Sequence, residues 1–234
     1  MAQPEVYALI PAAGQGRRLG GSVLKQYLPM AGRPVLAHAI EALQRHPGIS
    51  DVTVVLAEDD QGFEEAMDPA FAGVHTATGG ASRAQSVLNG LHAIGARCDA
   101  SDWVLVHDAA RPCLPAACLD ALMDRGLAHP DGAILALPVR DTLKRAGKDG
   151  TILDTVGRNH LWVAQTPQLF PLQRLVGALE ALVAGGVAPT DEASAMQYAG
   201  ARPLLVMGSP ANIKITWPGD VAIAQAWLGA EHSS

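Results

Sequence analysis

Short, mostly apolar runs recur along the chain and alternate with segments of helical spacing. The runs are typical of strands buried in a parallel sheet and cover residues 6–10, 52–57, 74–78, 103–106, 133–139 and 203–207. Apolar residues recur at helical spacing over residues 34–46, 58–67, 82–94, 116–128 and 172–183. This alternation predicts an α/β fold with an open, mostly parallel sheet, helices on both faces, and ligands bound beyond the carboxyl ends of the strands.

The alternation breaks over residues 139–162, where the chain predicts a protruding β-arm. Two extended segments, DTLKRA and TILDTV, flank residues 147–150, and the Asp149-Gly150 pair there is a turn signal. An isolated hairpin is marginally stable in water, yet this one carries the apolar side chains of Leu143, Ile152, Leu153 and Val156. We therefore expect the arm to pack against a second copy of the chain, forming a homodimer. An arm folded back on its own domain is the alternative.

The last third of the chain predicts three further elements. The sequence TDEAS, residues 190–194, supplies a capping oxygen and negative charge for a helix that runs to about residue 198. The sequence NIKITWPGD predicts a short strand around Ile213 and Ile215, and Pro218 then opens a final helix.

Composition limits the class of protein. The 234 residues suit a single α/β domain spanning residues 1–234, with 49% hydrophobic and 17% charged residues. No apolar run has the length of a transmembrane helix, and no signal-peptide pattern opens the chain, so we expect no membrane partner. The three cysteines are odd in number and do not occur in metal-like pairs, which favours reduced thiols and a cytoplasmic location. A net charge of -6 argues against general nucleic-acid binding.

A glycine-rich, arginine-bearing loop follows the first predicted strand. Between Glu5 and Glu41 the chain has no acidic residue, whereas four cations fall there: Arg17, Arg18, Lys25 and Arg33. Glycines in this stretch let the backbone approach a ligand closely. A local cationic site on an acidic chain predicts a polyphosphate ligand. The alternative is a flexible surface turn with solvated arginines.

Two common phosphate-binding motifs do not fit this loop. The dinucleotide fingerprint requires a glycine where Leu19 stands, and the P-loop requires a lysine where Ser22 stands. The loop is therefore a phosphate loop of another kind.

Nine motifs occur in order along nearly the whole chain: PAAGQGRRL, KQY, GGASRAQSV, HDAARP, VRDT, GRNHLW, TPQ, TDEAS and NIKIT. Together they resemble the 2-C-methyl-D-erythritol 4-phosphate cytidylyltransferase family of the non-mevalonate isoprenoid pathway. The resemblance implies a Rossmann-like nucleotidyltransferase fold and a homodimer joined through the arm. It also implies transfer of CMP from CTP to the methylerythritol phosphate, with magnesium (Mg2+) as cofactor.

The resemblance also assigns roles to particular residues. It places the catalytic cations Arg18, Lys25 and Lys214 around the α-phosphate, where charge grows in the transition state. The nucleotide-binding residues are Ala12, Ala13, Gly14, Gly80 and Ser86, with the last two helping to read cytosine. The acceptor-binding residues are Asp108, Thr142 and Arg158, of which the two in the arm reach the partner subunit's site.

Several of these side chains have plainer interpretations. Asp108 follows the strand over residues 103–106, where its carboxylate could hold magnesium or a substrate hydroxyl, but it could also cap a helix. Lys214 could be a surface lysine with a buried stem. His107, on the opposite face of the strand, is expected to be a core residue.

Three rival functions remain open from the sequence. A ribitol 5-phosphate cytidylyltransferase would share the nucleotide loop, although GRNHLW and NIKIT favour the methylerythritol enzyme. A sugar nucleotidyltransferase for another base is a second rival. A non-catalytic nucleotide-binding regulator is the third, and it would not need Arg18, Lys25 and Lys214 directed at the α-phosphate.

Overall fold

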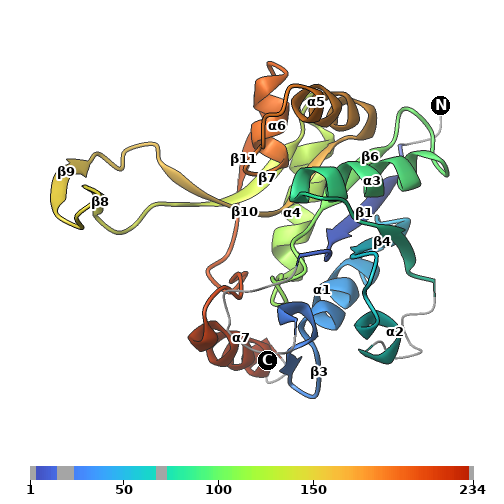
Figure 1. The fold of residues 1–234 in the computed structure, drawn as a ribbon, viewed down its shortest axis with the longest axis horizontal. Helices are drawn as coiled ribbons and strands as arrows, with labels where there is room; N and C mark the ends of the chain where they lie inside the picture. The colour runs from blue at the N-terminus through green and yellow to red at the C-terminus, as the bar shows by residue number, and fades with distance from the viewer. Residues whose placement is uncertain (1–3, 15–23, 67–72, 232–234) are drawn as a thin grey trace.

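A seven-stranded sheet forms the centre of the protein (Figure 1). The computed structural model describes residues 4–14, 24–66 and 73–231. The strand order is β11-β7-β10-β6-β1-β4-β5, and all neighbouring pairs are parallel except the two that β10 makes. The strands are β1 (Val6–Pro11), β4 (Asp51–Leu56), β5 (His75–Thr78), β6 (Trp103–Val106), β7 (Ala133–Pro138), β10 (Trp162–Pro171) and β11 (Leu204–Met207). The mostly parallel sheet predicted from the sequence is confirmed.

Helices cover both faces of the sheet, also as predicted (Figure 1). They are α1 (Val35–Gln44) and α4 (Ala116–Leu127) on one face, and α3 (Arg83–Gly95) and α5 (Leu172–Ala184) on the other. Side chains alternate between the faces of a strand. In β1, Ala8 and Ile10 therefore pack in the core cluster of α1 and α4, whereas Tyr7 and Leu9 pack in that of α3 and α5.

Smaller elements surround the carboxyl edge and the ends of the sheet. They are the 3-10 helix η2 (Lys25–Tyr27), the strand pair β2 (Pro29–Met30) and β3 (Arg33–Pro34), and the helices α2 (Gly62–Ala66), α6 (Glu192–Tyr198) and α7 (Pro218–Glu231). A third core cluster joins α7 to this strand pair through Met30, Ile215 and Leu228. Within the described ranges, no helix combines the length and apolar character needed to cross a bilayer.

The arm is a two-stranded hairpin made of β8 (Leu143–Ala146) and β9 (Ile152–Val156). It projects away from the central sheet (Figure 1). In β9, Ile152 and Leu153 are each 66% exposed. The alternative in which the arm folds back on its own domain is therefore wrong. That a second copy of the chain covers these residues stays a prediction.

The sequence reading missed β10, the one antiparallel strand of the central sheet. β10 lies between β6 and β7 and pairs with both. Its apolar pattern is broken by Gln165, Thr166, Pro167 and Gln168, and its pairing with β7 shifts register there. The three polar side chains of this run are nevertheless buried. The strand was not predicted, because a search for apolar runs does not detect buried polar residues.

Two predicted elements need correction. No strand forms around Ile213 and Ile215; the Ile215 N–H instead donates one hydrogen bond to the Ala110 carbonyl, at 2.8 Å. The helix expected over residues 58–67 is shorter, since in the described part of the chain α2 begins at Gly62. The Asp60 carboxylate accepts from the Gly62 and Phe63 N–H groups and so fixes this later start.

Close packing of α3 on the sheet gives a test of the fold. A Cβ at Gly90 would lie 2.5 Å from Leu9 Cδ1 and 2.6 Å from Val55 Cγ2, both buried. We expect Gly90→Ala to lower the free energy of unfolding by about 1–3 kcal/mol, because the core there is already filled. Urea denaturation measures the change.

Gly177→Ala is the matched control, since a Cβ at this exposed position of α5 meets nothing within 4 Å. It should raise the free energy of unfolding by up to about 1 kcal/mol. Equal effects of the two substitutions would contradict the close approach of α3 to the sheet.

Candidate active site

A cavity of about 440 Å³ opens beyond the carboxyl ends of β1 and β6. Its walls come from the loop after β1, from η2, from the turn before α3, from the loop after β6 and from the segment before α7. This is the edge at which ligands of open α/β sheets bind. Eight of the predicted site residues line it: Ala12, Ala13, Gly14, Lys25, Gly80, Ser86, Asp108 and Lys214.

Three predicted site residues are not part of this group. Arg18 lies outside the described residues. Thr142 and Arg158 are exposed residues of the arm and do not line the cavity of their own chain. The structure thus brings together the predicted nucleotide and lysine positions, and it separates the arm residues from them.

Buried hydrogen bonds shape the backbone on the nucleotide side of the cavity. The Ala12 N–H donates to the Val55 carbonyl at 2.8 Å, so the loop leaves β1 in register with β4. The buried Gln26 side chain donates to the Ala12 carbonyl at 2.9 Å. This bond ties η2, and with it Lys25, to the start of the loop.

The turn before α3 is equally fixed. Ser82 is the N-cap of α3 and accepts from the Gln85 N–H. The Ser86 hydroxyl accepts from the Gly80 N–H at 3.0 Å and donates to the Ser82 carbonyl at 2.9 Å. Ser86 therefore shapes the turn in this structure, and its reading of a cytosine base stays a prediction.

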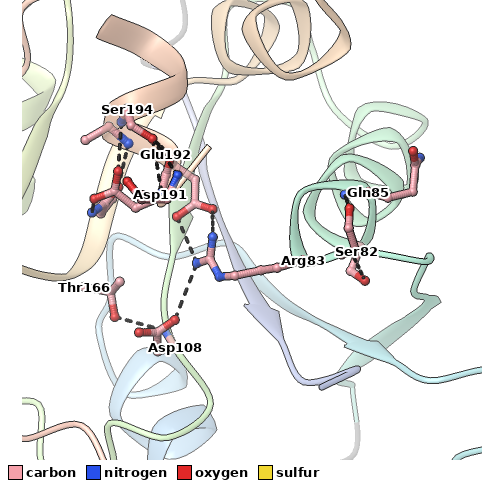
Figure 2. A network of polar contacts seen from close by, with 12 residues as sticks. Ser82, Arg83, Gln85, Asp108, Thr166, Asp191, Glu192 and Ser194 are labelled. Atoms are coloured by element: carbon pink, nitrogen blue, oxygen red, sulfur yellow. Dashed lines mark hydrogen bonds and ion pairs between the residues drawn. The ribbon is translucent and has the colours of Figure 1, made fainter. Parts of the chain in front are cut away.

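Asp108 is the centre of a charged network on the opposite wall. Its Oδ2 lies 2.8 Å from Lys214 Nζ and 3.6 Å from Arg111 Nε, and its Oδ1 lies 3.4 Å from an Nη of Arg83. The Asp108 N–H donates to Thr166 Oγ1 at 3.0 Å (Figure 2). One carboxylate thus holds three cations at the rim of the sheet.

The pKa values follow from this arrangement. Burial alone would raise the pKa of Asp108, but the charges of Lys214, Arg83 and Arg111, with the Lys214 hydrogen bond, outweigh it. The pKa of Asp108 therefore lies well below its usual range, and the carboxylate is ionised at neutral pH. Burial lowers the pKa of Arg111, although Asp108 opposes this shift.

Lys214 reaches the cavity from an irregular segment that buried polar groups hold in place. The Asn212 side chain, which is fully buried, donates to the Thr166 carbonyl at 2.7 Å. The Asn212 carbonyl accepts from Arg111 at 2.7 Å. These bonds replace the strand pairing that the sequence suggested, and they fix the backbone two residues before Lys214.

His107 is a core residue, as expected. It is fully buried, with Nε2 3.0 Å from the Arg111 carbonyl oxygen and Nδ1 3.1 Å from Thr166 Oγ1. Burial lowers its pKa to about 4, so the ring is neutral near pH 7. It supports the loop that carries Asp108.

Two residues of the network were missed by the sequence reading, namely Arg83 and Glu192. Arg83 lines the cavity and pairs with both Glu192 and Asp108. A cation in the first turn of a helix is electrostatically unfavourable. An arginine at the predicted start of α3 was therefore a signal that an acidic partner lay nearby.

The protein offers few ligands for a metal ion in this cavity. Among the described residues, no group of three His, Cys, Asp or Glu side chains could hold a metal. Asp108 is the single carboxylate among the described lining residues, and it already has Lys214 and Arg83 as partners. The lining therefore fits a metal carried by phosphate oxygens better than one held by the protein.

Comparison with known proteins gives a consistent result. The family model "IspD: 2-C-methyl-D-erythritol 4-phosphate cytidylyltransferase" matches residues 6–230. A protein of that name from Shewanella amazonensis is 50% identical over 229 residues, which cover 97% of this chain and 94% of the relative. One from Xylella fastidiosa strain 9a5c is 50% identical over 216 residues, covering 92% and 94%.

Solved structures agree with the sequence matches. A 4-diphosphocytidyl-2C-methyl-D-erythritol synthase superposes with a TM-score of 0.86 at 39% identity, covering 97% of this chain and 100% of the other. The Francisella tularensis 2-C-methyl-D-erythritol 4-phosphate cytidylyltransferase superposes with a TM-score of 0.83 at 31% identity, covering 95% and 99%. The chain belongs to the 2-C-methyl-D-erythritol 4-phosphate cytidylyltransferase family.

Proposed function

We propose that the protein transfers CMP from CTP to 2-C-methyl-D-erythritol 4-phosphate, giving 4-diphosphocytidyl-2-C-methyl-D-erythritol and pyrophosphate. The observation that carries this proposal is the convergence of Lys25, Lys214 and Asp108 in one cavity with the loop after β1. Family membership favours this acceptor over ribitol 5-phosphate, and it favours an enzyme over a non-catalytic regulator.

The reaction needs no nucleophile from the protein. A phosphate oxygen of the acceptor attacks the α-phosphorus of CTP, the bond to the bridging oxygen breaks, and pyrophosphate leaves with the electron pair. Catalysis therefore consists of positioning and of charge stabilisation. Lys25 and Lys214 supply fixed positive charge where negative charge grows, and the proposal adds Arg18 from the loop.

Fixed cations at the cavity offset the repulsion between the two reactants. Two polyanions must meet, and two unit charges about 4 Å apart interact by roughly 4 kcal/mol at an effective dielectric near 20. Around the described cavity stand Lys25, Lys214 and Arg83, with Arg111 behind them on Asp108. Positive charge held in advance reduces this repulsion without reorganisation during the reaction.

Magnesium is the proposed cofactor. When bound to the triphosphate, Mg2+ neutralises phosphate charge and polarises the phosphoryl oxygens. Asp108 is the lining carboxylate able to reach such an ion, while its pairing with Lys214 favours the nucleotide as the main carrier. Asp108 also remains the proposed contact for a hydroxyl of the acceptor.

The proposal includes a homodimer in which the arm completes the partner subunit's site. Thr142 and Arg158 are exposed on an arm that projects from the domain, and they do not line the candidate active-site cavity of their own chain. Ile152 and Leu153 are both 66% exposed, and burial of these apolar side chains against a second subunit would remove them from water. The Arg158 guanidinium would form a fork on the acceptor phosphate. A cytoplasmic location stays a prediction from the cysteines.

The choice of nucleotide and acceptor tests the proposed function. The protein is incubated with each nucleoside triphosphate and with either methylerythritol phosphate or ribitol 5-phosphate, and pyrophosphate release is measured. We expect release with CTP and methylerythritol phosphate, because the family takes this pair. Turnover with ribitol 5-phosphate alone would support the rival transferase, and CTP binding without turnover would support the regulator.

Substitution of the two cavity lysines tests the proposed charge stabilisation. Lys25→Ala and Lys214→Ala should each lower kcat by about two to three orders of magnitude, because they act on charge that develops in the transition state. CTP binding, measured by calorimetry, should be largely retained. Arg125→Ala, which removes an exposed cation of α4, is the control and should leave kcat unchanged. Turnover near wild type in either lysine variant would remove the proposed mechanism.

Substitution of Arg158 tests the proposed role of the arm. Arg158→Ala should raise the KM for the polyol phosphate more than the KM for CTP, because only the acceptor would contact the arm. Mixed dimers of Arg158→Ala and Lys25→Ala subunits should regain activity, since one of their two sites would combine an intact Lys25 with the partner subunit's Arg158. Failure of the mixed dimers to regain activity would contradict a site shared between subunits.

A further inference from the structure

Glu192 does not line the cavity, yet it contacts a residue that does. Its side chain is 1% exposed, and it is the first residue of α6. Its two oxygens accept from the two Nη groups of Arg83, at 2.6 and 3.2 Å (Figure 2). Burying a carboxylate is costly unless a well-oriented partner satisfies it, and the planar guanidinium fork is such a partner.

Arg83 transmits this fixed geometry to Asp108. The Nη2 atom that bonds Glu192 also lies 3.4 Å from Asp108 Oδ1, so the guanidinium stands between the two carboxylates (Figure 2). The other oxygen of Asp108 lies 2.8 Å from Lys214 Nζ. The two oxygens of Asp108 are thus divided, one toward Arg83 and one toward Lys214.

We propose that Glu192 is a positioning residue for the transfer reaction: it fixes the Arg83 guanidinium, which orients the Asp108 carboxylate that holds Lys214. This inference rests on the proposed function. Without the charge of Glu192, the fork of Arg83 turns fully to Asp108, the remaining carboxylate beside it. The ion pair between Asp108 and Lys214 then weakens. The lysine ammonium moves away from the position in which it would contact the reacting phosphate.

A purely structural role is the competing explanation. Glu192 could serve only to anchor the start of α6 through its pair with Arg83. In that case its substitution changes stability, while folded molecules retain the turnover of the wild type.

Glu192→Gln separates these two roles because it keeps the shape of the side chain and removes its charge. We expect kcat to fall about 10- to 100-fold, less than for removal of the lysine itself, because Lys214 keeps its charge but loses its position at the reacting phosphate. The KM for CTP should change by less than about twofold, because the loop that binds the nucleotide is untouched. Glu41→Gln, which removes another carboxylate paired with two arginines, is the matched control and should leave kcat unchanged.

A double-mutant cycle tests whether Glu192 acts through Arg83. Arg83→Gln alone strands a buried carboxylate, so its effect includes damage to the fold. Arg83→Gln combined with Glu192→Gln removes both charges and should fold even where a single variant does not. If Glu192 acts through Arg83, the double variant loses no more turnover than the worse single variant. Multiplied losses would overturn the proposal.

A structural measurement keeps this inference separate from the proposed function. In a crystal structure of Glu192→Gln, Lys214 Nζ should lie beyond hydrogen-bonding distance of Asp108 Oδ2. Turnover of the wild type with CTP and methylerythritol phosphate is measured first. Its absence would contradict the proposed function but would not change the expected Lys214–Asp108 distance. An unchanged distance, or unchanged kcat in a folded Glu192→Gln variant, would overturn the positioning role.

Discussion

The rest of the site depends on the ion pairs that the carboxylate of Asp108 makes with three cations. Lys214, Arg83 and Arg111 all direct their charges at it, although they come from three separate parts of the chain. Cations placed this close together repel one another unless an anion separates them. A single ionised carboxylate at the end of β6 therefore allows the protein to keep positive charge in place before any phosphate arrives.

The antiparallel strand β10 is what makes this carboxylate position possible. Gln168 pairs with Val106 at the end of β6, and because β10 runs in the opposite direction, the residues before Gln168 continue past the carboxyl edge. Thr166 therefore lies beside the loop after β6 and accepts the Asp108 N–H, while its carbonyl accepts from Asn212. A parallel strand here would have carried residues 164–166 to the opposite edge. The departure from parallel pairing thus serves the site directly.

Much of the fold could be predicted because buried strands and amphipathic helices leave a hydrophobic pattern. The strands that contain Leu9 and Val106 could be predicted from the local pattern, without knowledge of long-range contacts. β10 could not be found in this way, since Gln165, Thr166 and Gln168 are buried through hydrogen bonds rather than through apolar character. The segment of Lys214 was misread as a strand because its two isoleucines alternate with polar residues, whereas Asn212 actually fixes it.

Site residues could be predicted where the local sequence around them carries the signal, and not where their role depends on a distant partner. Lys25 and the residues around Gly14 were found from a local absence of acids and from glycine content. The pair of Arg83 and Glu192 joins positions 109 residues apart, so the unfavourable arginine at the start of α3 did not indicate which acidic residue is its partner. A buried ion pair contributes little to stability on average, since desolvation offsets the attraction. Its value here lies in orientation: the fork of Arg83 can satisfy a buried carboxylate and touch Asp108 in one plane only, so burial of Glu192 limits where the Asp108 carboxylate and Lys214 can stand.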